Sequence, residues 1–239
     1  MEKQMKSGKN VQHVYLVGAK SLGAYGGYET FVYKLTEYHQ NKENIRKEPA
    51  GPESSRMSQK MEAGAVGSFL GVRECDVTLA IAEKTKQVLT ERGYQVIMTR
   101  ESNDVNMSWA ERARLAEKSG AGALIHIHAH SQESTSVTGV LASCQSSGNP
   151  YNGDLASESY ALSSCIAGSV SQAAGAKNRG VKQTDTSSEI NWSQVPVTSL
   201  ETGFLSNQQE ELLLSQEEYQ SRIAVGIADG LDQFFAGRR

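Results

Sequence analysis

The feature that most constrains the fold of this 239-residue chain is a regular alternation of helical and strand-like patterns from residue 74 onward. The expected elements follow in the order helix 74–92, strand 94–100, helix 109–119, strands 123–128 and 139–144, helix 157–174, strand 197–200, and helices 208–214 and 216–235. We expect the polar segment 175–196 to be a loop. Strands that alternate with helices of about ten or more residues form sheets covered on both faces. The sequence therefore predicts an α/β fold, a single three-layer domain with a mostly parallel twisted sheet flanked by helices.

Composition excludes several classes of protein. The formal net charge of −3 and the pI near 6.0 offer no electrostatic basis for binding nucleic acid. No apolar run approaches the roughly 18 residues of a transmembrane helix. We recognise no signal peptide, because residues 1–10 are polar and the apolar run at 11–18 is too short. Three cysteines without CxxC spacing argue against a cysteine zinc cluster and a disulfide scaffold.

One acidic side chain stands out because of its position. The segment L-E-T-G-F-L-S-N at 200–207 places Glu201 at the end of an apolar strand, just before a glycine turn. A carboxylate is costly to bury unless it is paired or acts on something. In sheets of this class, ligands gather at the carboxyl ends of the strands. Glu201 is therefore a candidate catalytic residue.

Three histidines end a second apolar strand. His126, His128 and His130 are spaced two residues apart, so on a strand they project from the same face. Histidine is a common zinc ligand, but each could instead hydrogen-bond within the core. Glu74 opens a predicted helix, where an acidic residue also favours the helix dipole without any ligand. The pattern indicates a metal hydrolase, with the structural alternatives left open.

Most of the chain resembles a known family. From about residue 48 to 235 it is similar to the zinc-dependent N-acetylmuramoyl-L-alanine amidases of the amidase-3 type, which cleave the amide between the lactyl group of muramic acid and the first L-alanine of the peptidoglycan stem. The matching segments are R-E-C-D-V-T-L at 73–79, 94–100, 108–113, I-H-A at 127–129, N-R-G-V at 178–181 and 200–207. The resemblance implies a peptidoglycan substrate and an extracellular or cell-wall location.

The same resemblance implies roles for individual residues. It assigns Glu74 and His128 as zinc ligands and Glu201 as the general base. A zinc ion held by two imidazoles and one carboxylate keeps a fourth position for water, as hydrolysis requires. His130 stands where the family usually has asparagine after I-H-A, so it either contacts substrate or has no role.

The amino-terminal part departs from that family. The D-x-G-H segment that carries the first zinc histidine is absent, and residues 1–45 instead resemble the start of bacterial glycosyltransferases that build surface polysaccharide. We predict two parts, an incomplete transferase-like segment at 1–45 and an amidase-3-like catalytic domain at 46–239. The strand-like run at 11–18 could fill the vacant central position of the sheet without restoring a ligand.

His39 is the only available substitute for the missing ligand, as part of a Y-H-Q segment. The opposing interpretation places His39 at the solvent-facing end of a transferase-like helix. The sequence therefore leaves three functions to compare. The first is a peptidoglycan amidase whose zinc site is complete if His39 reaches it, and the second is an inactive cell-wall-binding remnant. The third, a sugar-nucleotide transferase, is poorly supported because its matching segment is too short to form a domain.

Overall fold

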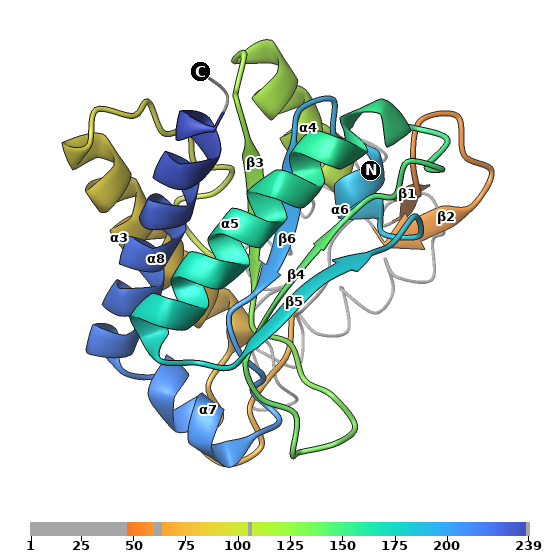
Figure 1. The fold of residues 1–239 in the computed structure, drawn as a ribbon. Helices are drawn as coiled ribbons and strands as arrows, with labels where there is room; N and C mark the ends of the chain where they lie inside the picture. Colours follow the sequence, from red (N-terminus) through yellow and green to blue (C-terminus); the bar gives the residue numbers. More distant parts are fainter. Residues whose placement is uncertain (1–46, 60–63, 105–106, 238–239) are drawn as a thin grey trace, which may run out of the picture.

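The computed structural model describes residues 47–59, 64–104 and 107–237 (Figure 1). The predictions for the segment 1–45 and for His39 lie outside these residues. Within the described part, no helix combines the length and the apolar character needed to cross a bilayer.

A four-stranded sheet forms the centre of the domain. Its strands are β3 (Leu124–His128), β6 (Val197–Glu201), β4 (Val140–Cys144) and β5 (Asn178–Gln183), in that spatial order. The pairs β3–β6 and β4–β5 are parallel, and β4–β6 is antiparallel. The expected mostly parallel α/β sheet is confirmed. The segment 175–196 is a correction, because it contains β5 and a short helix rather than a continuous loop.

Helices cover both faces of this sheet. The helices are α3 (Glu74–Glu91), α4 (Trp109–Lys118), α5 (Ala156–Ala174), α6 (Ser188–Asn191), α7 (Gln208–Leu214) and α8 (Glu217–Ala236), with a 3₁₀ turn at Gly153–Leu155. Helix α5 packs across β4, β5 and β6, while α8 packs against α5 and α3 (Figure 1). On the other face, α4 and α6 meet the first residues of β3 and β6. A short antiparallel hairpin, β1 (Lys47–Pro49) with β2 (Met57–Gln59), precedes these layers.

Local sequence signals explain where several helices begin and end. Ser108 and Glu111 form a reciprocal capping box at the start of α4, as their spacing predicts. The carboxylate of Glu48 also accepts a hydrogen bond from the backbone N–H of Trp109 at 2.9 Å. Helix α5 ends at Gly175, whose φ of 67° lies in the left-handed region that favours glycine.

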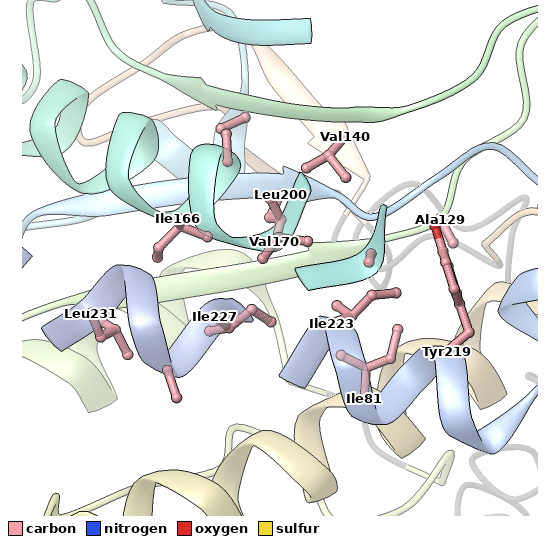
Figure 2. Packing of buried hydrophobic residues seen from close by; sticks show 14 of the residues in the cluster. Ile81, Ala129, Val140, Ile166, Val170, Leu200, Tyr219, Ile223, Ile227 and Leu231 are labelled. Carbon is pink, nitrogen blue, oxygen red and sulfur yellow. The ribbon is translucent and has the colours of Figure 1, made fainter. Parts of the chain in front are cut away.

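The main core lies between the sheet and the α5–α8 pair (Figure 2). It includes Leu200 of β6, Ile166 of α5 and Ile223 and Ile227 of α8, all with 0% exposure. Helices α5 and α8 approach closely at Gly230. A Cβ built at this glycine would lie only 2.6 Å from Cα of Ile166. Backbone contact of this kind fixes α5 against α8, and α5 in turn packs on β4, β5 and β6.

The predicted strand at 94–100 is a further correction, because the structure assigns no strand there. Its side chains still alternate, with Val96 and Met98 partly buried and Ile97 56% exposed. Strand β3 is at the edge of the described sheet, and a cavity of about 460 Å³ is lined both by residues 94–100 and by β3. A strand requires a hydrogen-bonded neighbour, and no described strand lies beside this segment. This absence explains why an apolar, alternating sequence remains unpaired.

Candidate metal and catalytic site

The site is built where β3 and β6 end side by side. His128 and Glu201 are partners in the parallel register of these strands, and each is the last residue of its strand. The backbone N–H and the hydroxyl of Thr202 both donate to the carbonyl of His128, at 2.9 and 2.8 Å. The N–H of Leu205 donates to the carbonyl of His130 at 2.8 Å. The two segments that leave the strands are therefore tied together, and their side chains share one location.

Glu74 enters this location from the first turn of α3. Its Oε1 lies 3.0 Å from Nδ1 of His128, and its Oε2 accepts the backbone N–H of Ala65 at 2.7 Å. Burial by itself would raise the pKa of this carboxyl group. Hydrogen bonding to His128 and the charges of His130 and His128 more than offset that effect and lower the pKa of Glu74 to about 2. Glu74 is therefore a buried, ionised carboxylate at neutral pH.

His130 joins the same cluster from just beyond the end of β3. Its Nε2 lies 3.5 Å from Oε1 of Glu74, and its ring centroid lies 4.6 Å from that of His128. One ligand atom from each of these three residues lies within 4.8 Å of the other two. Two imidazoles and a carboxylate at this separation are the donor set of a hydrolytic zinc site.

Each imidazole is held on its far side by a second carboxylate. Nδ1 of His130 lies 2.7 Å from Oε1 of Glu201, and Nε2 of His128 lies 2.8 Å from Oε2 of Glu189. Burial opposes a charge on His128, but Glu189 and then Glu74 outweigh it and raise the pKa of His128 well above its usual value. For Glu189, burial is again outweighed by His128, and the pKa of the carboxyl group falls far below its ordinary range. Three carboxylates around two imidazoles favour a bound cation.

Glu189 is the residue that sequence reasoning missed. It lies on α6, inside the segment 175–196 that was expected to be a loop. The local sequence T-S-S-E-I-N contains no recognisable ligand spacing. Only the fold brings Glu189 beside His128, which is 61 residues away in sequence.

The remaining predicted residues have different outcomes. His126 shares a strand with His128 but takes no part in the cluster, because it is buried at 7% exposure with its ring edge against Trp109. Burial lowers the pKa of His126 to about 4, so it is a neutral core histidine. Glu201 and His130 lie together as described above. His39 lies outside the described residues, and its role as a ligand stays a prediction.

A second cavity, of about 240 Å³, opens beside the imidazoles. Its lining comprises Arg56, Ser58, Trp109, His128, His130, Thr186, Ser187, Ser188 and Glu189. The cluster is therefore open to a ligand on one side, although Glu74 itself is buried. An open cavity beside a carboxylate–imidazole cluster is the arrangement that a hydrolytic site requires.

An α/β sheet with this cluster at the carboxyl ends of β3 and β6 defines a hydrolase with a candidate metal site. The family model described as N-acetylmuramoyl-L-alanine amidase (Amidase_3) matches residues 46–233, and the chain belongs to this family of amidases. A second family model, a domain of unknown function named DUF1972, matches residues 11–78. Both resemblances expected from the sequence are thus confirmed, and the two matches overlap at 46–78.

Among three individual relatives, two are amidases. The chain is 32% identical to the uncharacterised protein YqiI of Bacillus subtilis (strain 168), over 73% of this chain and 79% of YqiI. It is 30% identical to the N-acetylmuramoyl-L-alanine amidase LytC of the same organism, over 73% of this chain but only 33% of LytC. The solved catalytic domain of CwlV, an N-acetylmuramoyl-L-alanine amidase from Bacillus (Paenibacillus) polymyxa var. colistinus, superposes with a TM-score of 0.64 and 30% identity, over 72% of this chain and 90% of that domain.

Proposed function

We propose that this chain hydrolyses the amide bond between N-acetylmuramic acid and L-alanine in peptidoglycan, with zinc held by Glu74, His128 and His130. The observation that carries the proposal is the three-residue cluster, in which one ligand atom of each side chain lies within 4.8 Å of the others. Membership of the amidase family supports the reaction type. Because the substrate is part of the cell wall, we also propose that the protein acts there, outside the cytoplasmic membrane.

The proposed ligand set differs from the one that the sequence suggested. His130, expected either to contact substrate or to have no role, is the second histidine of the cluster. In the proposed site it takes the place of the ligand that the sequence suggested at His39. The donor set of one carboxylate and two imidazoles suits zinc and leaves a fourth position open. When bound, zinc supplies Lewis-acid chemistry, polarising the scissile carbonyl and acidifying a water molecule.

Glu201 is proposed to be the general base. Its Oε1 contacts Nδ1 of His130 and its Oε2 accepts the backbone N–H of the same residue at 3.2 Å. A carboxylate has about four lone-pair positions, so these two contacts leave capacity to accept a proton from water. Glu201 would then pass that proton to the departing amine of L-alanine. The cavity beside His128 and His130 would hold the amide during these steps.

Zinc stoichiometry and amidase activity on purified peptidoglycan test the proposal together. We expect about one zinc ion per chain in the unaltered protein, by elemental analysis. His130→Ala should lose both zinc and activity, whereas His39→Ala should keep both. Loss of zinc in the His39→Ala variant alone would instead make His39 the ligand.

A specific alternative is the inactive cell-wall-binding remnant. Its expected signature is a zinc-free protein that still sediments with peptidoglycan and releases no free L-alanine amino groups. The DUF1972 match begins at residue 11, before the amidase match at residue 46. The family's first zinc-histidine segment is absent from this amino-terminal part of the sequence, and its absence favours the alternative.

A further inference from the structure

We infer that Glu189 is a positioning residue that holds the imidazole of His128 with Nδ1 directed at Glu74 and the metal. This inference rests on the ligand set proposed above. It assigns a role to a residue that does not touch the proposed metal. The relevant contact is the 2.8 Å approach of Glu189 Oε2 to Nε2 of His128.

The geometry at His128 leaves one productive arrangement. Its Nδ1 faces Glu74 at 3.0 Å, and its Nε2 faces Glu189 on the opposite side of the ring. A neutral imidazole has one N–H donor and one lone pair. When Nδ1 binds a cation, Nε2 must carry the hydrogen, and an ionised carboxylate can only accept it. Glu189 therefore favours the tautomer that metal binding needs, as carboxylates behind metal-bound histidines do.

Glu189 can impose this orientation because its own carboxylate is fixed. The side chain is 13% exposed, and the hydroxyl of Ser187 donates to its Oε1 at 3.2 Å. A group that is both buried and hydrogen-bonded loses little further freedom when the metal binds.

The short helix α6 that carries Glu189 is anchored at several points. The buried amide of Asn152 donates to the carbonyls of Ile190 and Ser193 at 2.8 and 3.0 Å. The amide of Asn191 donates to the carbonyl of Ala50 at 3.0 Å, and the indole of Trp192 donates to that of Pro49 at 2.8 Å. These bonds attach α6 to the β1 hairpin and to the turn before α5. A four-residue helix would otherwise be too short to hold a side chain rigidly.

A purely structural ion pair would have different consequences. A buried carboxylate beside a histidine can contribute to folding without any effect on a ligand. Glu48 provides the matched control, because it is also buried, at 8% exposure, but its carboxylate accepts backbone N–H groups of α4 and does not contact His128. Substitution of either residue should alter stability, but only Glu189 should alter zinc binding.

The experiment compares the zinc dissociation constants of the unaltered chain and of the Glu189→Ala, Glu189→Gln and Glu48→Gln variants, by competition with a chromophoric chelator. We expect Glu189→Ala to weaken zinc binding about 10- to 100-fold. Glu189→Gln, whose amide oxygen still accepts from Nε2, should recover most of the affinity. Glu48→Gln should match the unaltered chain. Nitrogen-15 spectra of the zinc-loaded protein should show Nε2 of His128 protonated and hydrogen-bonded.

Two results would overturn the inference while leaving the proposed function intact. One is unchanged zinc affinity in Glu189→Ala. The other is a complete loss of zinc from both Glu189 variants, equal to that of His128→Ala, because Glu189 would then be a ligand. Zinc-free unaltered protein would reject the proposed function itself, so the two failures are distinguishable. Glu189→Gln preserves the shape of the side chain and keeps the test valid should Glu189→Ala fold poorly.

Discussion

Oε1 of Glu201 lies 2.7 Å from Nδ1 of His130, so the proposed base and a proposed zinc ligand are in direct contact. The other oxygen of Glu201 accepts the backbone N–H of His130, which fixes the carboxylate against the end of β3. Hydrogen bonding to Glu201, partly opposed by burial, raises the pKa of His130. The residues proposed to hold the metal and to move the proton therefore form one connected network.

Because of this contact, we expect the Glu201→Gln variant to lose proton transfer while it keeps its zinc. The amide oxygen of glutamine still accepts from Nδ1 of His130, so we expect zinc content to stay near that of the unaltered chain. Proton transfer is lost, and we expect amidase activity to fall by about 10²- to 10⁴-fold. Elemental analysis and release of free amino groups from peptidoglycan measure the two effects separately. Full activity in Glu201→Gln would show that the base is another residue.

His130→Asn tests whether this histidine is a ligand or only contacts substrate. Asparagine is the residue that the family resemblance leads us to expect after I-H-A. As a ligand, His130 cannot be replaced by an amide, and the variant should lose most of its zinc. His126→Asn is a useful comparison because His126 lies outside the cluster, although its burial means that folding must be checked by circular dichroism. Retention of zinc by His130→Asn would return His130 to the role of a substrate contact.

The close packing of α5 and α8 predicts that replacing two glycines by alanine has opposite effects on the stability of the protein. A methyl group at Gly230 would lie 2.6 Å from Cα of Ile166, so Gly230→Ala should destabilise the protein by about 1–3 kcal/mol. Gly168 lies within α5 with no neighbouring atom within 4 Å of a built Cβ. Gly168→Ala should therefore raise stability by about 0.5–1 kcal/mol through helix propensity. Guanidinium unfolding at constant pH measures both, and equal effects would contradict the packing described here.

We expect Asp185, which does not belong to the proposed metal site, to make a pH-dependent contribution to the free energy of unfolding. Hydrogen bonds from the hydroxyl and N–H of Ser146 and from the amide of Asn149 lower the pKa of Asp185 below its usual 3.8. The stabilisation is therefore present above pH 3.8 and is lost as pH falls through the lower folded-state pKa. At pH 7, Asp185→Asn should cost about 1 kcal/mol after solvent screening. The difference between Asp185→Asn and the unaltered chain should shrink in unfolding curves at pH 3, and a difference that stays the same at both pH values would contradict this prediction.

The unpaired edge of β3 gives a test for the hypothesis that residues 11–18 complete the sheet. The N–H of Leu124 faces β6, where it donates to the carbonyl of Pro196, so by parallel alternation the amides of Ile125 and Ile127 face the cavity. Residues 11–18 lie outside the described residues, and their pairing with β3 stays a prediction. It implies that both amides are protected from hydrogen exchange and that Leu16→Pro removes this protection. Gln4→Pro is the control, and rapid exchange in the unaltered chain would reject the hypothesis.

Much of the fold could be predicted because its signals are local. The capping box at Ser108, the end of α5 at Gly175 and the position of Glu201 at a strand terminus each depend on a few neighbouring residues. The strand predicted at 94–100 failed for the converse reason. Pairing depends on a neighbouring strand, and hydrophobic alternation in one segment carries no information about whether that neighbour is present.

The sequence by itself determined the α/β class and the family. It also indicated two residues of the candidate site, Glu74 at the start of a helix and His128 at the end of a strand. Only the tertiary structure brought His130 beside Glu74 and placed Glu189 behind His128. These contacts join residues 56 and 61 positions apart (130 − 74 and 189 − 128) on separate elements. Helical and strand periodicity describe which face of an element is buried, whereas the meeting of two elements depends on how the whole core packs.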